Sequence, residues 1–212
     1  MLTALLSLGL APAMASGVLA THTNAFIDSS NFQWRGTTPF DDDGSLPLEG
    51  DGLEGTVDWA VFTDTDFTTA FPGSGYTPPA GEMVYTFQIE VAGIADVSHL
   101  SVGIDSEPTG TSGVFSGAGV TGTAPIADSL SLTSADYSFV GNTIPVGGAS
   151  AGLVFSSIRI PKDFFGSLID GGSSALVIPL PSPSSVSIPE PATLVLAGMA
   201  VLLLGLMRRR DR

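Results

Sequence analysis

The side chains best suited to chemistry in this sequence are carboxylates that could bind a cation. Three aspartates at positions 41–43 run directly into Gly44. An EF-hand calcium loop in this frame needs oxygen ligands at two positions that are occupied instead by Pro39 and Gly50, so an EF-hand is excluded. Because calcium accepts irregular sets of oxygens, a calcium site of less regular geometry remains an alternative. Its candidate ligands are the four carboxylates Asp41, Asp43, Glu49 and Asp51. The alternative is a solvated acidic loop.

Two glycine-rich patterns match catalytic or phosphate-binding motifs but lack the required surroundings. Residues 117–122 have the G-x-G-x-x-G spacing of a dinucleotide loop, yet Pro125 follows where a helix is needed. Residues 148–152 match the nucleophile-elbow pattern, which requires a later histidine, whereas His22 and His99 both precede it. The two histidines also have no chelating spacing, and the chain has no cysteine. We therefore expect neither a catalytic residue nor an obligatory cofactor, with calcium as the one candidate ligand.

The charge balance limits the class of partner. The whole chain has a formal charge of −14, and residues 21–188 hold nineteen acidic but three basic side chains. Such a field repels nucleic acid and attracts divalent cations or basic partners. We expect no nucleic-acid partner.

The elements that must position these side chains are short strands. Apolar and polar residues alternate in several runs separated by Gly- and Pro-rich intervals. We expect half-buried strands at 56–63, 85–91, 99–104, 137–144, 153–160 and 175–180. The one helical turn expected is 161–169, because Pro161 and Asp163 suit the start of a helix. The pattern predicts an all-β fold, an antiparallel β-sandwich of jelly-roll-like or Ig-like type over 21–180. A Pro-rich linker is expected at 181–191.

The N-terminal residues 1–20 have the pattern of a secretory signal peptide. An apolar stretch is followed by small residues, and cleavage after Ala15 or after Ala20 satisfies the small-residue rule. No basic residue precedes the apolar stretch, so we expect the natural start to lie upstream of Met1. The alternative is a buried strand.

The C-terminal residues have the pattern of a membrane anchor. The apolar run 192–207 would rise about 24 Å as a helix, somewhat short of a hydrocarbon core of about 30 Å. The basic tail 208–212 supplies four arginines that can extend the span and mark the cytoplasmic side: Arg208, Arg209, Arg210 and Arg212. We expect a single transmembrane helix, with a buried C-terminal helix of a globular domain as the alternative.

Residues 188–212 resemble the PEP-CTERM sorting domain of Gram-negative bacteria. The resemblance rests on Pro189, Glu190 and Pro191, the short hydrophobic helix and the terminal arginine cluster. It implies that Pro189, Glu190 and Pro191 are recognised by exosortase, a membrane protease that cuts near them. The chain would then be held transiently in the inner membrane before reaching the cell surface or extracellular matrix.

These observations predict a non-catalytic exported protein of the surface, the extracellular polysaccharide or a biofilm matrix. A carbohydrate-binding sandwich, with or without calcium, is the alternative, and a secreted hydrolase is a third reading. Polysaccharide is therefore a possible partner beside exosortase.

Overall fold

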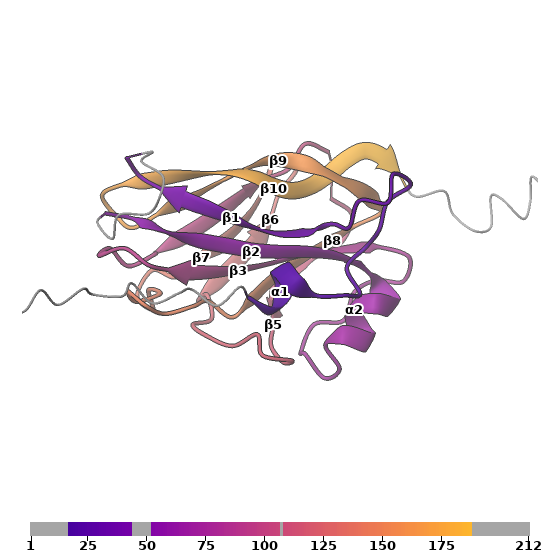
Figure 1. Ribbon diagram of the computed structural model, residues 1–212, viewed down its shortest axis with the longest axis horizontal. Helices are drawn as coiled ribbons and strands as arrows, with labels where there is room; N and C mark the ends of the chain where they lie inside the picture. Colours follow the sequence, from indigo (N-terminus) through magenta and orange to yellow (C-terminus); the bar gives the residue numbers. More distant parts are fainter. Residues whose placement is uncertain (1–16, 44–51, 107, 188–212) are drawn as a thin grey trace, which may run out of the picture.

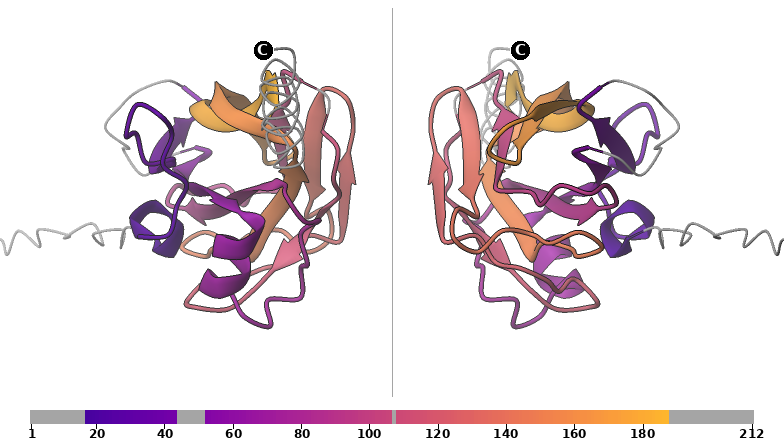
Figure 2. Two further views of the ribbon diagram at one scale, coloured as in Figure 1. Left: turned by 90° about the vertical axis from the view of Figure 1, so that its right-hand side faces the viewer. Right: turned by 90° about the vertical axis from the view of Figure 1, so that its left-hand side faces the viewer.

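The computed structural model describes residues 17–43, 52–106 and 108–187. Two five-stranded antiparallel sheets pack face to face, which confirms the predicted all-β sandwich (Figures 1 and 2). Sheet A contains, in spatial order, β1 (Arg35–Asp41), β2 (Glu54–Thr63), β3 (Met83–Val91), β8 (Gly152–Ser157) and β5 (Ser112–Phe115). Sheet B contains β10 (Ser174–Ser187), β9 (Arg159–Ile169), β4 (His99–Gly103), β7 (Ser134–Ser138) and β6 (Ala127–Leu130).

The main core lies between the two sheets and follows from period-2 alternation. Val57, Trp59 and Val61 of β2 point inward, and opposite them in the β2–β3 ladder lie the inward side chains of β3. Tyr85 of β3 stacks on Phe155 of β8 with ring centroids 4.9 Å apart. Side chains of this size each contribute roughly 1.5–3 kcal/mol when fully buried. This layer therefore holds the sandwich together without disulfides.

A second apolar cluster covers the outer face of sheet A. Phe62 and Val84 point away from the main core and meet two short helices, α1 (Val18–Thr21) and α2 (Asp64–Ala70). Figure 2 shows both helices on the side of β2 and β3 that faces away from β9 and β10. As a result, β2 and β3 are buried on both faces along most of their length, and the expected half-buried pattern was wrong for them.

Helix α2 follows β2 without a break and was not predicted. Its N-cap is Thr63, whose hydroxyl oxygen accepts the Asp66 backbone N–H at 3.1 Å. Its buried residue, Phe67, lies with Phe71 and Phe115 in the second cluster. Helix α2 therefore covers part of the second apolar cluster on the outer face of sheet A.

Residues 161–169, expected as a helical turn, belong to strand β9. This strand pairs with β10 on one side and with β4 on the other. A Cβ on Gly166 would lie 2.9 Å from the Ser101 carbonyl oxygen, so the strands approach closely where glycine stands. Pairing with β10 holds Pro161 and Asp163 in an extended backbone, and β4 adds pairing from Gly166 to Ile169, so the expectation of a helical turn was wrong.

The expected linker also begins too early, because residues 181–187 continue β10. The Asp105 N–H donates to the Ser182 hydroxyl at 3.2 Å, and the Thr38 hydroxyl donates to the Pro179 carbonyl at 2.5 Å. The β9–β10 ladder has two register shifts, and the first contains Pro179, whereas Pro181 and Pro183 stay paired with Asp163 and Pro161. The strand expected at 137–144 ends earlier, at Ser138 in β7.

The structure describes only part of the two terminal segments, the predicted signal peptide and the predicted transmembrane helix. Residues 1–16 and 192–212, including the expected transmembrane helix, lie outside the described residues. Of the expected signal peptide, 17–20 are described, and they pack on the sandwich through α1 and the fully buried Leu19. Neither helix of the described ranges is long and apolar enough to cross a membrane.

Candidate functional site

The predicted sorting residues follow directly on the last strand of the sandwich. Strand β10 ends at Ser187, two positions before Pro189. Figure 1 shows the arrowhead of β10 at the same end of the molecule as α2. The recognition residues Pro189, Glu190 and Pro191 and the terminal arginines Arg208, Arg209, Arg210 and Arg212 lie outside the described residues.

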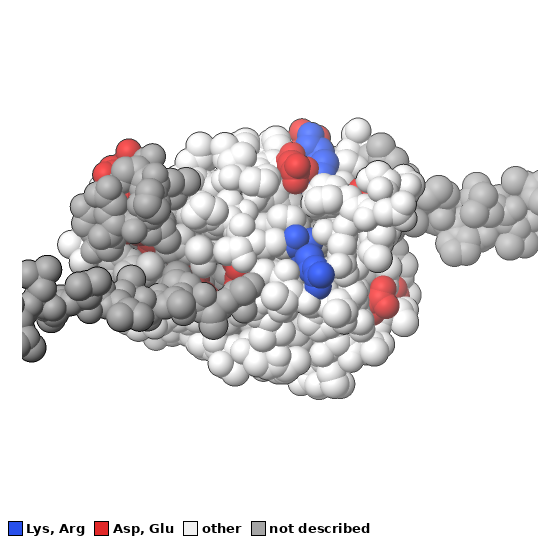
Figure 3. Space-filling view, in the orientation of Figure 1, with Lys and Arg blue, Asp and Glu red and all other residues white. Residues whose placement is uncertain are grey.

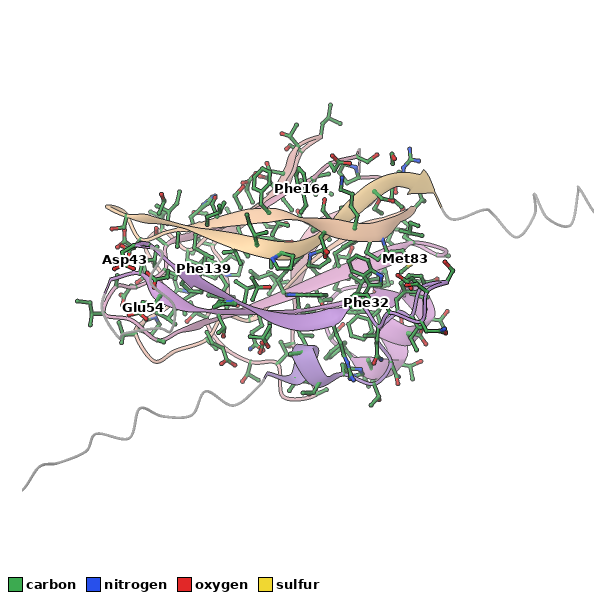
Figure 4. All side chains as sticks on the ribbon, turned by 45° about the horizontal axis from the view of Figure 1, so that its top comes forward. Phe32, Asp43, Glu54, Met83, Phe139 and Phe164 are labelled. Atoms are coloured by element: carbon green, nitrogen blue, oxygen red, sulfur yellow. The ribbon has the colours of Figure 1, made fainter. Side chains whose placement is uncertain are left out.

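The acidic loop lies at the opposite end of sheet A, where β1 ends and β2 begins. Figure 4 labels Asp43 and Glu54 at this end, and Figure 3 shows acidic side chains there on a face that is otherwise mostly uncharged. Asp41 uses Oδ1 to accept the Asp43 N–H at 3.0 Å, and Asp42 uses Oδ1 to accept the Leu53 N–H at 3.2 Å. These carboxylates therefore shape the turn itself.

Glu54 is a fully buried carboxylate that the sequence did not single out. It lies opposite Asp41 in the β1–β2 ladder, and within residues 17–43, 52–106 and 108–187 neither of its carboxylate oxygens has a hydrogen-bond partner. Like charges directly opposite one another in a sheet are destabilising unless something neutralises them. The described residues contain no group of three His, Cys, Asp or Glu side chains able to hold a metal. The calcium candidates Glu49 and Asp51 lie outside those residues, so a calcium site stays a prediction.

A second acidic pair lies further along the outer face of sheet A. Asp58 is 1% exposed, and its Oδ1 accepts a hydrogen bond from the Thr37 hydroxyl. Burial raises the pKa of Asp58, while the Thr37 hydroxyl and the nearby Gly17 backbone amide oppose that rise. Glu90 of β3 also has a raised pKa, first because it is partly buried and second because Asp58 is close. Two carboxylates thus share a poorly hydrated surface.

Gly17 packs directly against this pair. A Cβ on Gly17 would overlap the Asp58 carboxylate, so only glycine fits there. Among the described residues, no hydrogen bond of normal geometry reaches the buried Asp58 Oδ2 atom, although the Gly17 backbone amide lies close enough to lower the pKa of Asp58. The N-terminal segment therefore packs tightly against this carboxylate.

A third polar group joins residues that are distant in sequence. The Tyr76 hydroxyl lies 3.1 Å from the Ser156 hydroxyl, and the Thr109 hydroxyl donates to Glu82 Oε1 at 3.0 Å. Burial raises the pKa of Tyr76. No spacing in the sequence marks this group, because its members come from three separate segments: the α2–β3 connection, the β4–β5 connection and β8.

The motif-like patterns have structural roles. The Ser150 hydroxyl is fully buried and accepts the Ile89 N–H at 2.9 Å. His22 packs against the rings of Phe62 and Phe71, and His99 lies 3.7 Å from Asp136. Residues 117–122 form a loop between β5 and β6, with no helix after it. Neither the G-x-G-x-x-G pattern at 117–122 nor the nucleophile-elbow pattern at 148–152 has the neighbouring elements that its chemistry needs.

Comparison with protein families gives one match. Residues 187–210 match the PEP-CTERM protein-sorting motif, which confirms the resemblance inferred from the sequence. No curated protein and no solved structure matches the chain. The matched segment begins at the last residue of β10.

Proposed function

We propose that this chain is a non-catalytic exported protein, delivered to the cell surface or the extracellular polysaccharide matrix after exosortase cuts near Pro189, Glu190 and Pro191. The PEP-CTERM motif implies export and implies exosortase as the processing partner. The destination of the protein and its lack of catalytic activity go beyond the motif and are our proposal. In this proposal 192–207 holds the chain in the inner membrane until the cut, with the arginines on the cytoplasmic side.

One observation carries the proposal: the sorting motif begins at the last residue of β10. Ser187 closes β10 and opens the matched segment. The four residues 188–191 separate β10 from the apolar run, and the step from Ser187 to Ala192 spans at most about 18 Å when extended. The protease would therefore meet the signal beside a finished domain, and cutting it would not require the sandwich to unfold.

The non-catalytic reading is supported by how the described polar groups are used. The Ser150 hydroxyl is buried and occupied by a backbone N–H. The Tyr76 and Ser156 hydroxyls lie near the buried Glu82, an arrangement without a histidine base. In the part of the chain that the structure describes, these groups hold strands and loops together.

The processing step is tested by mass spectrometry of the C-terminus of the exported protein in its host. We expect the chain to end near Pro189–Pro191, without residues 192–212. Replacing Pro189, Glu190 and Pro191 together by alanine should leave the uncut chain in the envelope. Ser185→Ala is the matched control, because Ser185 is exposed and precedes the matched motif. An exported wild-type protein that still ends in Arg212 would contradict the proposal.

Destination and chemistry need separate measurements. Fractionation should find the processed domain outside the inner membrane, with the matrix or at the surface. Turnover of a polysaccharide or ester substrate that disappears when one carboxylate is changed would instead establish an enzyme.

A further inference from the structure

The outer face of sheet B carries an apolar patch on β9 and β10. Successive side chains of a strand point to opposite faces, and the inward ones here, such as Leu168 and Val177, are fully buried in the main core. Their neighbours on the outer face are also large and apolar, and each is at least 38% exposed. These four side chains are called the β9–β10 patch: Phe165, Ile169, Leu176 and Ile178. A sheet that faces water on one side normally has polar residues there, so the patch departs from that pattern.

The rest of the same face is polar. On β4 and β7 it presents Ser101, Ser134 and Asp136, and the Asp136 carboxylate accepts hydrogen bonds from both serine hydroxyls at 2.6 Å. Both described helices lie on the outer face of sheet A instead (Figure 2), which leaves the β9–β10 patch open to solvent. An exposed apolar patch with a polar border is typical of a surface that contacts a protein or a membrane.

We propose that the β9–β10 patch lies on the lipid surface of the membrane while the chain is anchored, before exosortase cuts it. The inference rests on the proposed function, because it needs the C-terminal run 192–207 in the bilayer. The patch would enter the boundary between headgroups and acyl chains, where apolar side chains are removed from water.

The point at which the proposed anchor leaves the domain favours lipid as the occupant. Strand β10 carries Leu176 and Ile178 and ends at Ser187, and the step from Ser187 to Ala192 spans at most about 18 Å. A domain held this close to the bilayer meets it at a high effective concentration, so a small apolar patch is enough for contact. Because the patch and the tether belong to the same strand, β10 lying along the bilayer brings both to one surface.

The charge of the two strands also suits this contact. Residues 21–188 hold nineteen acidic and three basic side chains, so an anionic lipid surface repels the body as a whole. Strands β9 and β10 differ, since they contain two of the three basic residues and a single acidic one: Arg159, Lys162 and Asp163. Lys162 Nζ lies 2.8 Å from Asp105 Oδ2, and Asp170 follows in the turn to β10. These strands are therefore close to neutral and meet anionic lipid with little repulsion.

The lack of cysteine in the sequence makes a site-specific test straightforward. Leu176→Cys places a single thiol in the patch. Leu132→Cys is the matched control, because both leucines are well exposed, at 58% and 64%, and Leu132 lies between β6 and β7 at the other edge of sheet B. Each thiol is labelled with a nitroxide in the full-length chain, which is reconstituted into vesicles of phosphatidylethanolamine and phosphatidylglycerol. Electron paramagnetic resonance then compares relaxation of the label by oxygen, which concentrates in lipid, and by a water-soluble nickel complex.

We expect the ratio of oxygen to nickel relaxation to be several-fold higher at position 176 than at position 132. Equal ratios in a chain that floats with the vesicles overturn the inference and leave the anchor intact. A chain that does not float with the vesicles overturns the proposed anchoring as well, so the two failures are distinguishable. Dipolar broadening between labels at position 176, without relaxation by oxygen, would assign the patch to a second copy of the chain and overturn the lipid contact.

A second set of variants tests whether the patch itself makes the contact. Ser167 lies opposite Leu176 in the β9–β10 ladder, so a label on Ser167→Cys reports on the centre of the patch. Replacing Leu176 and Ile178 together by serine should return this label to the relaxation of an aqueous site. Val140→Ser, at a side chain that is 61% exposed outside the patch, should leave it unchanged. A label that stays in lipid after the double change overturns the role of the patch.

Discussion

Leu19 offers the sharpest test of whether α1 belongs to the folded domain. Its side chain is completely buried against the outer cluster of sheet A. Leu19→Ala removes three carbons, worth about 0.8 kcal/mol each in transfer free energy, or about 2.4 kcal/mol together. The cavity left behind increases the cost, so we expect the free energy of unfolding to fall by about 2.5–5 kcal/mol.

The measurement is urea unfolding of the exported protein, followed by tryptophan fluorescence. Trp34 and Trp59 are both buried and should report loss of the sandwich. For a domain of this size, the expected change corresponds to a melting temperature lower by roughly 5–20 °C. Leu132→Ala is the matched control: the same atoms are removed from a side chain that is 64% exposed, and the change should stay within about 0.5 kcal/mol.

Comparing the two leucine variants shows whether α1 stabilises the folded domain. If Leu19→Ala is as mild as Leu132→Ala, the burial of Leu19 in the second apolar cluster does not stabilise the fold. If the urea m-value falls together with the midpoint, the variant has changed the unfolded or native ensemble, and the free-energy comparison no longer measures a cavity.

Three further predictions concern carboxylates and their neighbours. In the presence of a chelator, Glu54→Gln should raise the free energy of unfolding by about 1–3 kcal/mol, because it removes a buried charge that has no partner among the described residues. If the variant is instead less stable than the wild type, and only when calcium is added, Glu54 binds the ion. The pKa values of Asp58 and Glu90 are raised in the folded chain, so the stability that these carboxyls contribute is fully present below their unfolded pKa, near 4, and is lost as pH rises through the folded values; melting curves between pH 4 and 7 should show this decline, and Asp58→Asn should reduce it. Gly17→Ala should lower the melting temperature of the mature protein because its methyl group overlaps the Asp58 carboxylate, and an unchanged melting temperature would mean that this contact does not form in solution.

The sequence predicted the strands whose alternation is strong. Tyr85, Phe87 and Ile89 gave the position of β3 to within two residues at its start, and the run 56–63 gave most of β2. The burial of their outer faces was not predictable in the same way. It depends on α2, whose Phe67 and Phe71 are too few to produce a clear helical period.

The errors arose where local signals compete with pairing. Pro161 and Asp163 resemble the start of a helix, but pairing with β10 decides their conformation, and β4 joins β9 further along at 166–169. The Pro- and Ser-rich stretch after Leu180 has the composition of a linker, yet bulges let it pair with β9. Composition alone does not reveal those bulges.

The candidate sites show the same contrast between what local sequence signals predict and what depends on strand pairing. The acidic residues 41–43 were visible as a cluster, whereas the position of Glu54 opposite Asp41 depends on strand register. The contact between Asp58 and Glu90 likewise requires the pairing of β2 with β3. The sorting motif could be recognised from sequence alone because its information lies in the order of residues along one short segment.

The extension of β10 to Ser187 has a mechanical consequence. If the proposed C-terminal anchor is present, any pull through it enters the domain at the end of an edge strand whose only ladder partner among the described strands is β9. A load along the strand axis acts on this ladder in shear, so many hydrogen bonds resist together, whereas a sideways load peels them one at a time. In a chain anchored as proposed, the direction of the load relative to β10 would thus set the force that the domain withstands.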